Sequence, residues 1–228
     1  MARGTGCARS RALQASRNAF PGGNAAFRTL FSFPVLQRRF ATGRGALRAI
    51  LAGYLSMEPE RLKFGYTAYG KPFLLNSPAN IQFNLSHSGG PSWWQRFAGT
   101  GPSGWTLKNT ILDSTRWKSQ RRFFCEQEKA EIAGQDGEAR LEAFFQLWTA
   151  KEAFLKATSL GLALELSKFE IGLRPLRMLA LEDAAKIHGG RWNLVAFRPR
   201  KDYSGAVAVA GQPLRLDYRD FLPPSDLP

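Results

Sequence analysis

Acidic residues are missing from the first quarter of the chain. No Asp or Glu precedes Glu58, although nine arginines do. An acid-free start that contains Arg, Ser and Ala is typical of an organelle transit peptide. A poorly defined reading-frame start would have the same composition, so both interpretations stay open. In either case residues 1–35 form an N-terminal segment of uncertain fate, because a helical pattern begins only near Arg38.

Thiols and long apolar runs are also scarce. The chain has two cysteines, Cys7 and Cys125, in dissimilar contexts, which make neither a disulfide framework nor a metal site. No apolar run approaches the roughly 20 residues that cross a bilayer. We therefore expect a soluble protein of a reducing compartment, cytoplasmic unless residues 1–35 direct import into an organelle.

Positive charge, in contrast, is in excess. A formal net charge of +14 suggests nucleic acid, a membrane surface or a polyanionic small molecule as a partner. A basic nucleic-acid-binding protein is therefore one interpretation. Against it, the arginines do not interleave with aromatic residues in a known reader motif, and the chain has no Cys/His finger. Its 228 residues suit one large domain or two of about a hundred residues each.

The most informative stretch runs from Leu147 to Lys156. Its apolar residues recur at helical spacing, so they form one buried stripe. Glu152 and Lys156 are four residues apart and share a face of this helix, with Lys151 beside them. An exposed ion pair of this spacing stabilises a helix by only about 0.3–0.5 kcal/mol. A functional interpretation therefore needs partners elsewhere in the chain.

Two basic features precede that helix. Residues 38–54 have the spacing of an amphipathic helix, and its basic face includes Arg44. Further along, a short strand leads into the turn Gly70-Lys71-Pro72. The plainer interpretation of both is that their cations are simply solvated.

A third feature combines a strand with a loop of small residues. Residues 81–85 alternate between apolar and polar side chains, as a half-buried strand does, and Ser86 and His87 follow at its end. Backbone amides in such a loop can bind an anion. An incidental loop histidine is the plainer alternative.

The order of these elements predicts the fold class. Helix, loop and strands follow one another twice, over residues 38–90 and again over 122–210, where strands are expected at 164–173, 192–197 and 203–210. This order indicates an α+β fold of two similar halves rather than an alternating parallel sheet. We place the halves at residues 36–103 and 104–222.

Three stretches together resemble the surfactin-synthetase-activating type of 4′-phosphopantetheinyl transferase. They are the Gly70-Lys71-Pro72 turn, the Asn84-Leu85-Ser86-His87-Ser88 loop and the Trp148-x-x-Lys151-Glu152-x-x-x-Lys156 helix. The resemblance implies a monomeric enzyme whose site lies in the cleft between two similar α+β halves. It would transfer the phosphopantetheine arm of coenzyme A, with Mg²⁺, to a serine of an apo acyl or peptidyl carrier protein and release 3′,5′-adenosine bisphosphate. Whether the carrier belongs to fatty-acid, polyketide, peptide or lysine biosynthesis stays open.

The resemblance also implies residue roles. Glu152 would bind Mg²⁺ and, with Lys156, act in catalysis. Coenzyme A would be held by residues from all the stretches above: Arg44, Gly70, Lys71, Asn84, Leu85, Ser86, His87, Lys151 and Lys156. The chemistry of coenzyme A independently favours such residues, because its pyrophosphate and 3′-phosphate need several cations and loop amides around them.

One motif of the family is missing. The family has a strand that reads Gly-(Ile/Val)-Asp-x-Glu, whose two acids are metal ligands. At that place this chain has Gly104-Trp105-Thr106-Leu107-Lys108, with neither acid. Mg²⁺ prefers about six oxygen ligands, so Glu152 alone makes a poor site. A relative that binds coenzyme A without catalysing transfer is therefore a further alternative.

A frame slip would explain the missing motif. Read one nucleotide earlier, codons for Trp-Thr-Leu-Lys can encode Val-Asp-Ile-Glu. Residues 91–120 also contain four of the six tryptophans and show no strand or helix period. We therefore interpret residues 91–120 as an out-of-frame stretch, with a natural divergent insertion as the alternative. We expect the chain as written to lack a strand here and to fold poorly as a result.

Overall fold

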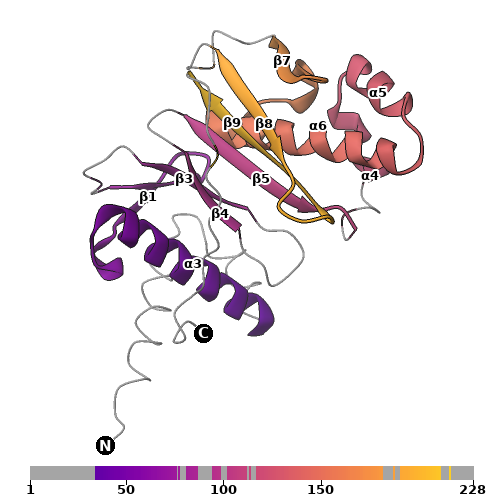
Figure 1. Cartoon of the computed structure of the whole chain (residues 1–228). Helices are drawn as coiled ribbons and strands as arrows, with labels where there is room; N and C mark the ends of the chain where they lie inside the picture. Colours follow the sequence, from indigo (N-terminus) through magenta and orange to yellow (C-terminus); the bar gives the residue numbers. More distant parts are fainter. Residues whose placement is uncertain are drawn as a thin grey trace, which may run out of the picture. The chain divides into compact units, whose positions relative to one another are not determined.

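The computed structural model describes residues 34–75, 77, 81–86, 94–98, 102–111, 113, 117–181, 187, 191–211 and 216 (Figure 1). The predicted N-terminal segment, except its last two residues, and His87 lie outside this set. The chain divides into two compact units, each described here by itself. Unit 1 comprises residues up to Tyr66 together with 72–79 and 217–228, and unit 2 comprises residues 67–71 and 80–216. The division into two similar halves at residues 36–103 and 104–222 is a different division from these units, and it remains a prediction.

Unit 1 is built around helix α3 (Pro34–Leu55), followed by a 3-10 turn (Pro59–Arg61). The predicted amphipathic helix is confirmed and begins four residues earlier than expected. Its apolar side includes Leu47 and Leu51, which are fully buried. On its basic side, the Arg48 guanidinium donates to the carbonyl oxygens of Pro59 and Leu62, at 2.8 and 3.0 Å. Arg48 therefore ties the helix to the chain that follows it.

Two short antiparallel strands also belong to unit 1, whereas the turn between them, residues 67–71, belongs to unit 2. Strands β1 (Phe64–Tyr66) and β2 (Pro72–Leu74) pair with Phe64 opposite Leu74. The turn between them requires a glycine, since Gly70 has φ +81°, in the left-handed region that side chains other than Gly rarely adopt. The predicted strand and turn are confirmed.

Unit 2 contains an antiparallel sheet in the order β5-β9-β8, with bounds Ser103–Asn109, Tyr203–Ala210 and Trp192–Phe197. Helix α6 (Gly137–Thr158) runs along one face of this sheet (Figure 1). Its buried aromatic side chains form much of the main core, and Phe154 packs against both Phe169 and Trp192. The predicted helix and the strands at 192–197 and 203–210 are confirmed.

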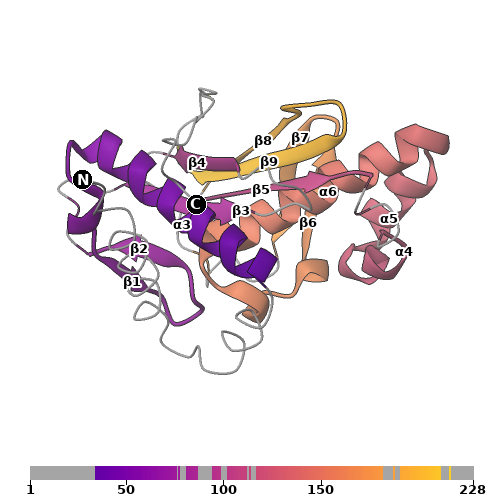
Figure 2. The same cartoon turned by 90° about the horizontal axis from the view of Figure 1, so that it is seen from below.

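Smaller elements surround this layer. Helix α5 (Glu126–Ala133) lies next to the N-terminal end of α6 (Figure 2), and the short helix α4 (Trp117–Gln120) and a 3-10 turn (Arg121–Phe123) precede it. Two further 3-10 turns follow α6, at Gly161–Ala163 and Leu166–Lys168. Strands β6 (Phe169–Leu173) and β7 (Leu176–Leu181) form one hairpin, and β3 (Gln82–Ser86) and β4 (Trp94–Ala98) form another. The strand predicted at 164–173 is therefore confirmed only from Phe169 onwards.

The expectation that residues 91–120 contain no strand is wrong, since β4 and β5 both lie within them. Strand β5 pairs with β9 over seven residues, from Ser103 opposite Val209 to Asn109 opposite Tyr203. Its side chains alternate, because Trp105 and Leu107 belong to an apolar cluster with β8 and β9 while Thr106 reaches α6. The ladder is therefore intact, and the predicted cause of poor folding is removed.

Gly104 explains how closely α6 approaches this strand. A Cβ at this position would collide with the carbonyl oxygen of Ala153 and the backbone nitrogen of Ala157. The backbone of α6 therefore lies directly on β5, close to Thr106 of the strand and to Glu152 and Lys156 of the helix. The described elements make an α+β fold, and the similarity of two halves stays a prediction. None of the described helices has the length and apolar character that a membrane crossing requires.

Candidate active site between helix α6 and strand β5

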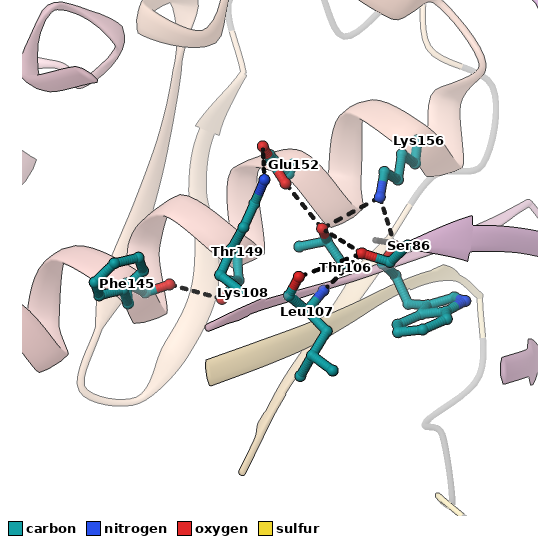
Figure 3. Close-up of polar contacts among 9 residues, drawn as sticks. Ser86, Thr106, Leu107, Lys108, Phe145, Thr149, Glu152 and Lys156 are labelled. Carbon is teal, nitrogen blue, oxygen red and sulfur yellow. Dashed lines mark hydrogen bonds and ion pairs between the residues drawn. The ribbon is translucent and has the colours of Figure 1, made fainter. Parts of the chain in front are cut away.

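Glu152 and Lys156 project from α6 towards β5, one helical turn apart (Figure 3). The predicted shared face is therefore confirmed, but the two side chains do not pair with each other in an exposed bridge. They bond instead to groups on β5, which lies against this face of the helix. The helix and the strand together form a compact polar cluster of Thr106, Lys108, Glu152 and Lys156, here called the α6–β5 cluster.

Both carboxylate oxygens of Glu152 have a partner. Oε1 lies 3.0 Å from the Lys108 ammonium nitrogen, and Oε2 accepts a hydrogen bond of 2.8 Å from the Thr106 hydroxyl. The Lys108 and Glu152 side chains are 22% and 19% exposed, so the pair is only partly accessible to solvent. Partial burial strengthens such a pair relative to a fully exposed one.

Lys156 is the second cation of the α6–β5 cluster. Its ammonium donates to the Trp105 carbonyl oxygen and to the Thr106 hydroxyl oxygen, each at 3.2 Å. Burial is the main cause that lowers the pKa of Lys156 to about 8, and this value already includes an opposing effect of Glu152, which raises the pKa, and a smaller effect of Lys108, which lowers it. Close to neutral pH, Lys156 can therefore both bind an anion as an ammonium and exchange a proton.

Strand β3 brings two predicted residues to the same place. The Ser86 hydroxyl lies 3.2 Å from that of Thr106 and accepts a hydrogen bond of 3.0 Å from the Leu107 backbone nitrogen. Asn84 accepts from the Trp105 indole through its backbone oxygen, at 3.0 Å. Its side-chain oxygen Oδ1 is buried, and no donor among the described residues reaches it. A buried acceptor without a donor is unfavourable, so this atom suits the donor of a ligand.

Lys71 approaches β5 from the turn at residues 67–71, which belongs to the same unit. Its ammonium donates to the Ser103 carbonyl oxygen at 2.9 Å, at the start of the strand that carries Thr106 and Lys108. Burial lowers the pKa of Lys71 to about 8. Three of the predicted stretches therefore contribute polar side chains that contact β5. They are the turn that contains Lys71, strand β3 with Ser86, and helix α6.

Lys151 does not agree with its predicted role as a phosphate contact. It is fully buried and donates to the carbonyl oxygens of Leu166 and Phe169 at 2.6 and 2.7 Å, and it lies 2.8 Å from Glu128 Oε2. These three acceptors use all three protons of the ammonium group. Lys151 therefore holds the protein interior together and has no proton for a ligand.

The other predicted residues are placed as follows. Arg44 lies on α3 in unit 1 and donates to the Tyr66 hydroxyl at 3.1 Å. Gly70 is exposed at the tip of its turn, and the backbone of Leu85 pairs with Gln95 in the β3–β4 hairpin. Their roles in binding coenzyme A, like that of His87, stay predictions.

The residues present do not fit the predicted Mg²⁺ site. Glu152 is the one carboxylate of the α6–β5 cluster, and its two oxygens are engaged by Lys108 and Thr106. Across the described ranges no group of three or more His, Cys, Asp and Glu side chains could hold a metal ion. A divalent cation would also lie next to the Lys108 and Lys156 ammonium groups, which repel it.

Comparisons with known proteins agree with the resemblance seen in the sequence. The family model described as the 4′-phosphopantetheinyl transferase superfamily matches residues 109–208. The chain is 38% identical over 188 residues to the 4′-phosphopantetheinyl transferase HetI of a Nostoc species, covering 79% of this chain and 74% of HetI. It is 27% identical over 144 residues to the 4′-phosphopantetheinyl transferase Sfp of Bacillus subtilis, covering 63% of this chain and 62% of Sfp. The chain belongs to the 4′-phosphopantetheinyl transferase superfamily, a class of enzymes.

A solved structure is similar over about half of the chain. It is a holo-(acyl-carrier-protein) synthase from Bacillus anthracis in complex with CoA (3′,5′-ADP), with 19% identity and a TM-score of 0.40. The match covers 48% of this chain and 94% of that one.

Sequence reasoning missed Thr106 and Lys108 as members of the site. The interpretation of residues 91–120 as out of frame removed both from consideration. The signal that could have found them is the period of two in Gly104, Thr106 and Lys108, which places all three on one face of a strand. Since Gly104 permits close contact with α6, the same face brings Thr106 and Lys108 to Glu152.

Proposed function

We propose that this chain transfers the phosphopantetheine arm of coenzyme A to a serine hydroxyl of an apo acyl or peptidyl carrier protein. The observation that supports this most directly is the α6–β5 cluster, in which Glu152 contacts the Thr106 and Lys108 side chains of β5 and the Lys156 ammonium also bonds to this strand. It occurs in a chain of the 4′-phosphopantetheinyl transferase superfamily. The two lysines match a substrate that carries a pyrophosphate.

The reaction needs a proton acceptor and charge neutralisation. The serine oxygen forms a bond to the phosphorus that bears the arm, and the bond from that phosphorus to the bridging oxygen breaks. The electron pair of that bond leaves with 3′,5′-adenosine bisphosphate, and the serine proton passes to a base. Glu152, the carboxylate of the α6–β5 cluster, is the proposed base. Negative charge develops on the equatorial and leaving oxygens, next to which Lys156 and Lys108 would act.

The remaining contacts follow from the same geometry. Lys71 supplies a further cation beside β5, and the donor-free Asn84 Oδ1 would accept a hydrogen bond from the nucleotide. Ser86 would orient Thr106 and the backbone of β5. Arg44, Gly70, Leu85 and His87 are proposed to complete the nucleotide site, as the resemblance implies. Lys151 is left out because all its protons are used.

A mass-spectrometric assay tests the proposal. The purified chain is incubated with coenzyme A and, separately, with apo carrier proteins of fatty-acid, polyketide, peptide and lysine biosynthesis. We expect at least one carrier to gain the mass of one phosphopantetheine arm at its serine, with release of 3′,5′-adenosine bisphosphate. The Glu152→Gln variant should lose transfer, whereas Glu126→Gln, a matched change on the surface of α5, should retain it. Equal transfer by Glu152→Gln would contradict the role of Glu152.

A relative that binds coenzyme A without transferring its arm is the second candidate. The observation that favours it is that both oxygens of Glu152 already have partners, with which the serine proton would compete. Calorimetry separates the two functions. Binding of coenzyme A with no modification of any carrier would establish the second candidate in place of the first.

A further inference from the structure

We propose that the Lys108 ammonium occupies the position beside Glu152 that a divalent cation would otherwise take, so that this chain binds its pyrophosphate substrate without a metal ion. The proposal rests on the proposed function, since it concerns the same site and the same substrate. It goes further because it makes Lys108 the substitute for the metal ion in substrate binding.

The geometry provides the first argument. Lys108 Nζ lies 3.0 Å from Glu152 Oε1, and the second oxygen of that carboxylate accepts the Thr106 proton (Figure 3). The carboxylate therefore has a cation on one oxygen and a hydrogen-bond donor on the other. A metal ion bound to Glu152 would either lie beside the Lys108 ammonium, which repels it, or displace Lys108 and leave that ammonium in a partly buried site without its counter-charge.

Charge provides the second argument. Lys108, Glu152 and Lys156 together carry two positive charges and one negative charge, so the α6–β5 cluster has a net charge of +1. Lys71 adds a further cation next to β5. A divalent cation is repelled by this excess, whereas a pyrophosphate is attracted by it. The α6–β5 cluster is therefore already complementary to the anion.

Unused protons provide the third argument. Among the described residues, Lys108 Nζ has one acceptor, Glu152 Oε1, and Lys156 Nζ has two, the oxygens of Trp105 and Thr106. An ammonium group has three protons, so two remain on Lys108 and one on Lys156. These protons can each donate to a phosphate oxygen, and such charge-assisted bonds are among the stronger ones in proteins.

Calorimetric titration of coenzyme A into the full chain tests the proposal. We expect the same dissociation constant in buffer with EDTA and in buffer with excess Mg²⁺. The variant Lys108→Met should weaken binding by about 10- to 100-fold in both buffers, as the loss of one charge-assisted contact implies. Lys129→Met removes a lysine of the same charge from the surface of α5 and should leave the constant unchanged. Tighter binding by the unaltered chain in Mg²⁺, by tenfold or more, would overturn the proposal.

A reversal variant provides an independent test. Thr106→Asp with Lys108→Glu places three carboxylates around one lysine and changes the net charge of the α6–β5 cluster from +1 to −2. Mg²⁺ alone should raise the melting temperature of this variant and not that of the unaltered chain. A rise for the unaltered chain would overturn the proposal even if the variant does not fold.

The two proposals fail in different ways. If coenzyme A binds equally with and without Mg²⁺ but no carrier protein is modified, the transfer function is wrong and the role of Lys108 stands. If carriers are modified only in the presence of Mg²⁺, and Mg²⁺ strengthens coenzyme A binding, the transfer function stands and the role of Lys108 is wrong.

Discussion

Lys151 and Glu128 form a fully buried ion pair, with 2.8 Å between Nζ and Oε2. The pair connects three elements of unit 2, because Glu128 Oε1 also accepts from the Ile171 backbone nitrogen at 2.9 Å and Oε2 from that of Cys125 at 3.0 Å. Glu128 on α5 is thus bonded both to α6 and to β6. The ammonium of Lys151 lies over the Phe169 ring as well, 4.3 Å from its centroid.

Breaking this pair should destabilise the protein strongly. Lys151→Met leaves the Glu128 carboxylate buried without its counter-charge, and we expect a loss of about 3–5 kcal/mol in the free energy of unfolding, measured by urea denaturation. Lys129→Met, which breaks the exposed pair with Glu126, should lose less than about 1 kcal/mol. The double variant with Glu128→Gln should recover part of the loss. Equal effects of the two lysine changes would contradict the structural role of Lys151.

Gly104→Ala should displace α6 from β5. The added Cβ would meet the backbone of α6 at Ala153 and Ala157, which cannot move aside as a flexible side chain can. We expect a loss of about 1–3 kcal/mol or more in urea denaturation. Gly53→Ala on α3 is the matched control, since no atom lies within 4 Å of its added Cβ, and it should stabilise the helix by about 0.5–1 kcal/mol. A neutral effect at Gly104 would mean that the helix does not pack on the strand as closely as described.

Binding of coenzyme A should weaken as the pH rises through about 8. The pKa values of Lys156 and Lys71 are both lowered to about 8, so both ammonium groups lose their protons there and no longer attract phosphate. Calorimetry from pH 7 to pH 9 should show this decline. Lys156→Arg with Lys71→Arg should flatten it, since arginine stays protonated. A profile that stays steep in the double variant would assign the decline to another group.

Stability should show the opposite trend with pH. The native state binds fewer protons at Lys156 than the unfolded chain does between pH about 8 and the ordinary lysine pKa of about 10.4. The free energy of unfolding therefore rises with pH across this window. Urea denaturation at pH 8 and pH 10 should show a smaller rise for Lys156→Met than for the unaltered chain. An identical rise in both would show that Lys156 has an ordinary pKa when the protein is folded.

The nucleotide sequence behind residues 91–120 gives a further prediction. We expect that the transcript, read one base earlier, encodes Asp and Glu in place of Thr106 and Lys108. The family match begins at Asn109, directly after these two residues. Transcript sequencing decides the matter, and a transcript without an Asp-x-Glu in that frame would contradict the slip. The reversal variant Thr106→Asp with Lys108→Glu reproduces the two acids that the slip would restore, whereas the metal-free binding proposed above concerns the chain that carries Thr106 and Lys108.

Local sequence patterns predicted helices and strands correctly where the spacing of apolar side chains determines the secondary structure. The stripe around Phe154 predicted α6, and the alternation at 192–197 and 203–210 predicted β8 and β9. The same patterns failed where contacts between residues distant in the sequence determine the role of a side chain. A lysine next to Glu152 on a helix reads as a ligand contact, but the carbonyl oxygens of Leu166 and Phe169, far along the chain, make Lys151 a buried anchor instead. Strand β5 was missed because its residues were judged by composition rather than by their alternation.

Trp105 offers an optical readout of the site. Its indole is buried and donates to the Asn84 backbone, while its own carbonyl oxygen accepts from Lys156. Any ligand that draws the Lys156 ammonium away from the strand alters the electric field at this ring. The fluorescence spectrum of the chain therefore carries a signal of site occupancy, which subtraction of the Trp105→Phe spectrum isolates from the emission of the other five tryptophans without an attached dye.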